Sequence, residues 1–439
     1  MTEPVNHDRA PADWNGKKTS LSSGIVWNAF ALGFMALAGI GLNLAVGRTY
    51  GAAALGTFNI TFALYIFFSQ IAAFGLHLSV LRGVSASVSE GASRTAMVVY
   101  SGLALCLCLA ILVTLLAVLS NPIIARLFPA VPDLEVSWLI AAPGLLAFAI
   151  NKYLLGVVNG LQHMRAFAVF QSLRYVLILG MLLSLYSFGA PAPWLSAALS
   201  CSEFVLTLFI LAYVLKAVPP IRHKLFDRAE IHRHLHFGAR VFPAGLVAEL
   251  NTRVDVLMVG AFLNDRAAGI YSIAGLIYEA ALQAVMVLRN NINPRLARAI
   301  AEGRTDEILS FSRKLASILT PLLAVGAVGA WFCFPVVAPW IFVGSDFDQV
   351  QDPLLWLMLA VPIAGASLCY SLVLSVAGFP FWQSVQMIVG LVVAVVLCSV
   401  LIPRMGLSGA AVAMGVSSVV TGFLGIWLAR RLRGLRIFF

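Results

Sequence analysis

Charged residues are scarce in this chain. Asp, Glu, Lys and Arg make up 11% of the 439 residues, hydrophobic residues make up 61%, and the mean hydropathy is +0.93. Soluble globular domains carry roughly 25% charged residues, so the composition excludes that class. The apolar runs are about 20 residues long and do not alternate with polar residues, which favours helices over a transmembrane β-barrel. The sequence therefore predicts an all-α polytopic membrane protein.

Motifs for nucleotides, metals and covalent catalysis are also missing. The six cysteines all lie inside apolar runs, so we expect no disulfide framework, no metal site and no cofactor. No G-x-x-x-x-G-K-S/T loop occurs, which argues against ATP as the direct energy source. Asp346 and Asp348 match the D-x-D of metal-dependent glycosyltransferases, but no folded domain surrounds them to hold a nucleotide sugar, so we expect an ordinary acidic outer loop. These absences predict a transporter, driven by gradients or by substrate flow, rather than an enzyme.

Apolar segments long enough to cross a membrane as helices recur along the whole chain. The twelve segments lie near residues 25–46, 55–80, 96–118, 136–157, 167–187, 194–215, 238–262, 268–291, 315–340, 354–376, 382–402 and 407–429. The net charge of +10 marks topology rather than a nucleic-acid partner, because Lys and Arg are concentrated in alternate loops. With the N-terminus inside, the outer loops hold only Arg48, Arg126, Arg266 and Arg404. This asymmetry supports an even number of spans, with both termini cytoplasmic.

The second half of the chain repeats the first. A shift of 213 positions aligns residues of the first two predicted helices with those of the seventh and eighth, and a shift of 212 aligns Gln171 with Gln383. The aligned pairs include Gly47 with Gly260, Gly56 with Gly269, Asn59 with Ser272, Gln70 with Gln283, His77 with Asn290, and Arg82 with Arg295. We therefore expect two homologous six-helix bundles around a central cavity, related by an axis along the membrane normal.

The predicted organisation has five parts. They are a cytoplasmic tail (1–20), a first bundle (21–215), a basic cytoplasmic linker (216–237), a second bundle (238–429) and a basic cytoplasmic tail (430–439). The linker contains an H-R-H-L-H run from His232 to His236, with His223 nearby. Histidines at i, i+2 and i+4 of a helix do not converge on one ion, so we expect a solvated or headgroup-facing linker without a metal.

Polar side chains at helical spacing mark one face of each repeated helix. In the first half these residues are Asn59, Gln70 and His77, and in the second they are Ser272, Glu279, Gln283, Asn290 and Asn293. At 3.6 residues per turn each set falls on one side of its helix, and such a stripe requires water or a ligand. We expect the two stripes to lie opposite one another across the cavity.

Ionisable side chains inside the predicted spans are the candidate functional residues. The basic ones are Lys152, Arg174, Arg253 and Arg289, and the acidic ones are Glu203, Glu249, Asp255 and Glu279. Each would cost roughly 2.5–3.5 kcal/mol facing lipid, so each is expected to pair or to face a cavity. Glu249 and Arg253 are four residues apart, which leaves a structural pair open as the alternative to a functional role.

Arg174 and Arg289 have no acid one helical turn away on their own helices. A guanidinium stays charged and makes forked hydrogen bonds to phosphate oxygens, so we predict that these two hold an anionic substrate. The four acids are candidates for ion coupling, since a buried carboxyl can take up and release a proton, or else they are counter-charges for the arginines.

Residues 47–82 and 251–285 resemble the polysaccharide-transporter branch of the MOP flippase superfamily. The resemblance covers nearly the whole chain through the number of spans and the order of the repeats. Its motifs are a Gly-x-aromatic after the first outer turn and the Asn-x-x-x-Asp of Asn251 and Asp255.

This resemblance implies a flippase of a bacterial inner membrane. It would move undecaprenyl-diphosphate-linked oligosaccharides to the outer leaflet for O-antigen or exopolysaccharide synthesis, by alternating access of the two bundles. Its partners would be this substrate, membrane lipids and other polysaccharide-assembly membrane proteins. Together with the polar stripes, the cationic cavity of that family gives the expected substrate-binding set: Lys152, Arg174, Arg253, Arg289, Gln70, His77, Gln283 and Asn290.

Two other functions stay open. A multidrug or organic-cation exporter of the same superfamily would favour an acidic cavity, whereas basic and acidic groups balance here. A membrane glycosyltransferase, ligase or polymerase of polysaccharide synthesis would need a sizeable outer domain or loop, and the outer loops are short.

The charge asymmetry gives a testable topology. Reporters fused after Arg222 and after Arg436 should score as cytoplasmic, and one fused after Asp348 should score as external. Paired alkaline phosphatase and green fluorescent protein fusions measure this directly. An external signal at Arg222 would rule out the arrangement of twelve spans.

Overall fold

The computed structural model describes residues 21–220, 227–342 and 345–438, and in these ranges the chain is helical with short turns. The first half contains α1 (Leu21–Ala73), α2 (Leu76–Ser87), α3 (Ala92–Leu119), α4 (Asn121–Leu127), α5 (Leu134–Ala141), α6 (Gly144–Gly160), α7 (Met164–Ser187) and α8 (Ala197–Ala217). The second half contains α9 (Arg228–Asn251), α10 (Val254–Phe262), α11 (Asp265–Ala301), α12 (Thr305–Ile341), α13 (Gln351–Leu368), α14 (Val373–Val376), α15 (Pro380–Met405) and α16 (Leu407–Arg433). Short 3-10 helices are η2 (Val88–Glu90), η3 (Ala192–Ser196) and η4 (Ser345–Val350). The predicted tail 1–20 lies outside the described residues.

The predicted membrane spans all fall on helices. By length and hydropathy, nine helices of the described part can cross a membrane, or ten if α5 and α6, bent by 45°, form one span. The structure differs from the prediction of twelve spans at two places. The α1 helix has 53 residues, which would make about 80 Å if straight, and its helical geometry is broken at Gly51. It therefore contains the first two predicted spans, and the seventh is divided between the polar α9 and the nine-residue α10.

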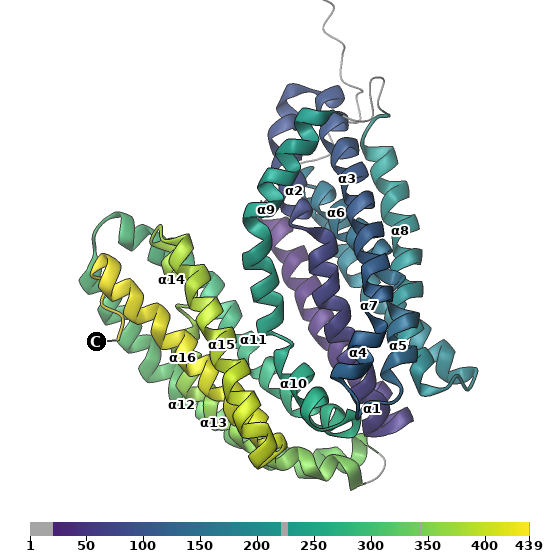
Figure 1. Cartoon of the computed structure of the whole chain (residues 1–439). Helices are drawn as coiled ribbons and strands as arrows, with labels where there is room; N and C mark the ends of the chain where they lie inside the picture. Colours follow the sequence, from purple (N-terminus) through teal and green to yellow (C-terminus); the bar gives the residue numbers. More distant parts are fainter. Residues whose placement is uncertain (1–20, 221–226, 343–344, 439) are drawn as a thin grey trace, which may run out of the picture.

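The buried side chains form three hydrophobic clusters that show how the two halves meet. One cluster joins both halves and includes Leu55 and Trp138 from the first with Tyr271 and Leu354 from the second. The second cluster lies wholly between residues 72 and 218, and the third between residues 285 and 437. The bundles therefore share a core at one end and have separate cores at the other. Figure 1 shows the same arrangement, because the helices converge near α10 and separate towards α2 and α14.

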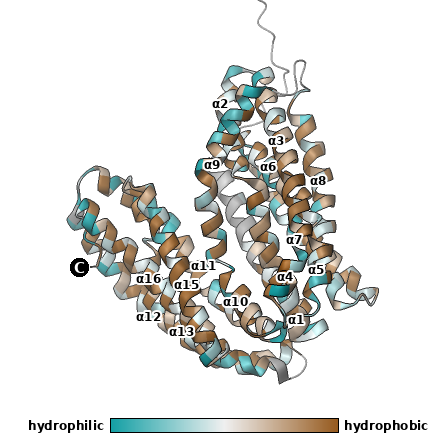
Figure 2. Ribbon diagram, viewed as in Figure 1, coloured by the Kyte–Doolittle hydropathy of each residue, from teal (hydrophilic) through white to brown (hydrophobic). Residues whose placement is uncertain are grey.

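The separated end is the basic end. It carries the turn between α2 and α3, the start of α9, the turn between α11 and α12, and the end of α16. Arg94, Arg228, Arg304 and Arg433 lie in these segments, which the sequence assigns to the cytoplasm. In Figure 2 the long sides of the helices are mostly hydrophobic, and hydrophilic residues gather around α2 and the start of α9. The two bundles thus separate towards the side that we expect to be cytoplasmic.

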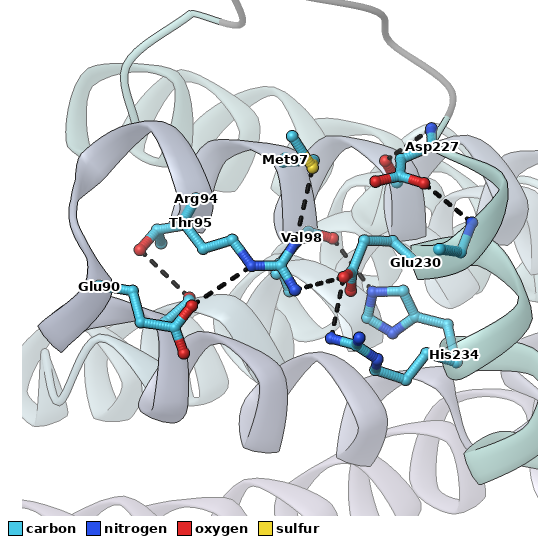
Figure 3. A network of polar contacts seen from close by, with 12 residues as sticks. Glu90, Arg94, Thr95, Met97, Val98, Asp227, Glu230 and His234 are labelled. Carbon is cyan, nitrogen blue, oxygen red and sulfur yellow. Dashed lines mark hydrogen bonds and ion pairs between the residues drawn. The ribbon is translucent and has the colours of Figure 1, made fainter.

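The first part of α9 is docked on the first bundle, as Figure 3 shows. His234 is 3% exposed. Its Nδ1 lies 2.9 Å from Ser79 Oγ and its Nε2 lies 3.1 Å from the carbonyl oxygen of Val98. Burial lowers the pKa of His234, so the ring is neutral: Nε2 donates to Val98, and Nδ1 accepts from the hydroxyl of Ser79.

An ion-pair cluster stands beside this histidine. Glu230 is buried and pairs with Arg94 of α3 and, at 2.9 Å, with Arg233. The expected solvated linker is therefore wrong for Glu230 and His234, because both are covered by α2 and α3. Residues 221–226, which include His223, lie outside the described residues.

Candidate functional site

A pocket lies where the shared core ends and the bundles begin to separate. Its polar lining comes from both halves: Asn43, Asn59, Thr252, Arg253, Asp255, Ser272 and Glu279. Asn59 and Ser272 are the outermost members of the two predicted stripes and correspond to each other in the repeat. Both line one pocket. That the whole stripes face each other across a central cavity stays a prediction.

The groups around this pocket are partly engaged with one another. Asn59 Nδ2 donates to Asn43 Oδ1 at 2.9 Å, and Tyr271 donates to Asp255 Oδ2 at 3.2 Å. Arg253 lies over the ring of Phe62 in the first bundle, 5.4 Å from its centre. Of these contacts, the one between Arg253 and Phe62 joins the two bundles.

Arg253 also pairs with Glu279, at 3.9 Å, and both side chains are about one-third exposed or more. The alternative of a structural pair between Glu249 and Arg253, which the sequence left open, is therefore not what the structure shows. An i,i+4 pair requires a continuous helix, whereas α9 ends at Asn251 and Arg253 has φ −136 at the start of α10. The break turns Arg253 towards α11 and leaves Glu249 facing the first bundle.

Glu249 belongs to a second polar group, which crosses between the bundles. Gln70 Nε2 donates to Glu249 Oε1 at 2.7 Å, and Lys152 Nζ donates to Gln70 Oε1 at 2.8 Å. Lys152 Nζ lies 4.0 Å from Glu249 Oε1, and Glu249 is 35% exposed. Because this ion pair is long and Lys152 is itself 21% exposed, the lysine remains available to another anion. The structure thus brings three predicted site residues together.

Arg174 has a partner that lies on another helix. Its Nε is 2.7 Å from Glu203 Oε1, and Glu203 on α8 is 2% exposed. Asn151 of α6 donates to Glu203 Oε2 at 2.8 Å, and Arg174 stacks on Phe148, 4.6 Å from the ring centre. The carboxylate neutralises Arg174, so this arginine contributes less to an anion site than Lys152 does.

Arg289 of α11 makes no ion pair with any acid that the structure describes. Its Nη1 donates to Ser371 Oγ at 3.2 Å, and its Nη2 donates to Asn290 Oδ1 at 3.5 Å. A charged guanidinium with two neutral partners keeps donors for a phosphate. Arg289 is therefore the basic side chain of the predicted set whose charge is least offset.

The other members of the predicted set are less engaged. Gln283 and Asn290 are exposed on α11. His77 Nδ1 is buried without a hydrogen-bond partner in the described part of the chain. Across the same residues, no three His, Cys, Asp or Glu side chains are close enough to hold a metal ion.

Sequence reasoning missed several contributors, among them Asn43, Asn151 and Ser371. Asn43 and Asn151 are single amides inside apolar runs, and that signal could have found them. Ser371 gave no signal, because hydroxyl residues are common in membrane helices and its role depends on the position of Arg289.

Comparison with known proteins covers most of the chain. The profile of a family described as "Polysaccharide biosynthesis protein" matches residues 21–288. A search of curated proteins finds no match.

Among solved structures, the lipid II flippase MurJ in an inward closed conformation is similar to the chain with a TM-score of 0.75 and 14% identity, over 92% of this chain and 87% of that one. A MATE family multidrug transporter of the MOP superfamily is similar in its inward-facing conformation, with a TM-score of 0.70 and 14% identity over 91% of this chain and 94% of that one. An outward-facing conformation of such a transporter gives a TM-score of 0.60 and 15% identity, over 96% and 97% of the two chains. These TM-scores show that the chain has the same fold as the three structures.

The pair of Arg174 with Glu203 gives a prediction about stability. Arg174→Gln leaves the buried Glu203 carboxylate unpaired, which costs about 3–5 kcal/mol. Arg174→Gln with Glu203→Gln removes both charges, so the double variant should melt at a higher temperature than the single one. Thermal unfolding of the purified protein in detergent measures this.

The exposed pair of Arg253 with Glu279 is the matched control. Glutamine replacements there should change the melting temperature little, and their effects should add. If the decreases in melting temperature caused by Arg174→Gln and Glu203→Gln add in the double variant, the interpretation of that pair as a buried ion pair is contradicted.

Proposed function

The chain belongs to the polysaccharide biosynthesis protein family of the MOP superfamily, and on this premise we propose that it is a flippase for undecaprenyl-diphosphate-linked oligosaccharides. It moves the lipid-linked repeat unit from the inner to the outer leaflet of a bacterial inner membrane, for O-antigen or exopolysaccharide synthesis. Transport occurs by alternating access of the two bundles, with both termini cytoplasmic, and no covalent chemistry is involved.

One observation carries the proposal: each bundle contains a basic side chain whose charge is little offset. Lys152 of the first bundle faces Glu249 at 4.0 Å, and Arg289 of the second has neutral partners only, among the described residues. A diphosphate offers several strong acceptors to such donors, and its charge-assisted hydrogen bonds are about twice as strong as neutral ones. The oligosaccharide then lies among amides such as Gln70 and Gln283.

Glu249 has a defined place in this scheme. In the empty protein it shares Gln70 with Lys152 and partly offsets the lysine. An incoming diphosphate competes with this single carboxylate, displaces it from Lys152, and leaves Gln70 as its hydrogen-bond partner. The basic residues at the separated end of the bundles support entry from the cytoplasmic leaflet, because positive segments attract an anionic head group.

Ion coupling would use the carboxyls of the shared pocket. Asp255 is held by Tyr271 and Glu279 faces Arg253, so both lie where the two bundles meet. Glu203 is committed to Arg174 and Asn151, and Glu249 to Gln70. We therefore assign coupling to Asp255 and Glu279 in preference to the other two acids.

A multidrug exporter is the second candidate, because Asp255 and Glu279 would suit an organic cation. A glycosyltransferase, ligase or polymerase has less support, since the described outer segments carry no extra domain. Drug susceptibility of the same strains separates the two transport functions.

Other membrane proteins of polysaccharide assembly are the expected protein partners.

The proposal predicts specific losses in a flippase-null strain. The wild-type chain should restore surface polysaccharide. Lys152→Ala and Arg289→Ala should each reduce the rate of flipping roughly 10- to 100-fold, because a hydrogen bond to a charged group contributes about 1.5–3 kcal/mol. Arg289→Lys keeps the charge but loses the fork, and it should retain partial function. Arg174→Ala should lose function chiefly through stability. Surface polysaccharide and accumulated lipid-linked oligosaccharide are the readouts.

Arg126→Ala is the control, because this arginine is exposed on α4 at the opposite, outer end. It should behave as the wild type does. Normal surface polysaccharide in cells with Lys152→Ala and with Arg289→Ala, at equal protein levels, would remove the residue-level support for an anionic substrate. Drug resistance without polysaccharide would favour the exporter instead.

A further inference from the structure

Two glycines hold the bundles in backbone contact at their shared end. Gly56 lies on α1 and Gly269 on α11. A Cβ on Gly56 would overlap the carbonyl oxygen of Asp265 and lie 2.7 Å from Gly269 N. A Cβ on Gly269 would overlap the carbonyl oxygen of Ala52 and lie 2.9 Å from Gly56 N. These obstacles are backbone atoms and cannot rotate away, so only glycine allows the two helices to approach this closely.

The contact is reciprocal, and it follows from the repeat. Each glycine faces the carbonyl oxygen that lies four residues before the other glycine. The shift of 213 that relates Gly56 to Gly269 also relates Ala52 to Asp265. The axis between the two halves therefore passes between these helices, and the close approach at a glycine on each resembles the crossings of membrane helices at small residues.

The glycines lie on the outer side of the pocket. Asn59 and Ser272 line the pocket and follow Gly56 and Gly269 by three residues, about one turn further in on each helix. A second layer lies nearby, where the rings of Phe342 and Phe347 would be 3.0 and 3.3 Å from a Cβ on Gly47. The same end of the molecule contains the cluster of buried side chains that both halves share.

We propose that Gly56 and Gly269 are the outer gate of this transporter: their backbone contact seals the pocket from the outside and separates whenever the cavity opens outward. A methyl group on either glycine holds the helices apart, so the outer side cannot close. The inference rests on the alternating access of the proposed function, but it holds for any substrate.

Gly56→Ala and Gly269→Ala test the gate through the reactivity of a cysteine placed at Ser272. The background carries serine at the exposed Cys108, Cys201 and Cys333. A membrane-impermeant maleimide added outside cells should label the reporter slowly in this background. Because a minor state is typically populated at about 0.1–10%, making the outward-open state dominant should raise labelling by roughly 10-fold or more. Transport by the same two variants, assayed with native Ser272, should be lost.

Gly180→Ala on α7 and Gly326→Ala on α12 are matched controls, since nothing lies within 4 Å of a Cβ at either site. They should leave labelling and transport unchanged. If Gly56→Ala and Gly269→Ala also leave both unchanged, the gate is overturned. Labelling requires no substrate, so it tests the gate independently of the proposed function. If the variants label as expected but the wild-type chain fails to restore surface polysaccharide, the proposed substrate is wrong and the gate still holds.

A second measurement decides the matter if the alanine variants do not accumulate. Spin labels at the exposed Arg48 and Phe262, in the chain with both glycines present, report the separation of the two outer ends. The proposal requires two populations of the distance between the labels, one short and one long. The population with the long distance should grow during transport. A single short distance under transport conditions would overturn it.

Discussion

A charged side chain inside a membrane must meet another polar group or water, and the interior of this protein is arranged by that requirement. Facing lipid, each such group costs roughly 2.5–3.5 kcal/mol. The structure meets the cost by joining helices. Arg174 and Glu203 join α7 to α8 within the first bundle, and Arg253 and Glu279 join the start of α10 to α11. Lys152 and Glu249 meet through Gln70 between the two bundles.

These groups differ in how completely their charges are matched, and the differences assign their roles. The buried pair of Arg174 with Glu203 is short, is supported by Asn151, and stabilises one bundle. The pair of Lys152 with Glu249 is long and only partly buried, and Arg289 has no acidic partner within the described ranges. Positive charge that the protein itself leaves unmatched is what an anionic lipid head group would match.

The fold followed from the sequence because it depends on local patterns. Apolar runs placed the helices, and the shift that aligns Gly56 with Gly269 indicated two related halves. The site followed only in part, because its pairs join helices far apart in the chain. A search for acids on the helix of Arg174 could not find Glu203, because Glu203 lies on the next helix. The break after Asn251 separated Glu249 from Arg253, and the burial of His234 depended on how α9 packs against α2 and α3. Helix propensity and residue spacing do not show which helices pack against each other.

The division of the core indicates which part of the structure must change during transport. Each bundle has its own cluster at the basic end, whereas the outer cluster belongs to both. In the proposed alternating access each bundle would move as a body and the outer cluster would come apart. The central claim is that the bundles carry an anionic lipid between them, and flipping by the purified protein in liposomes tests it most directly. With undecaprenyl-diphosphate-linked oligosaccharide in both leaflets, an impermeant glycosidase should consume the inner pool when the wild-type chain is present. Protein with Lys152→Ala and Arg289→Ala should leave that pool intact, as empty liposomes do. Equal consumption by this variant, or none by the wild type, would contradict the account.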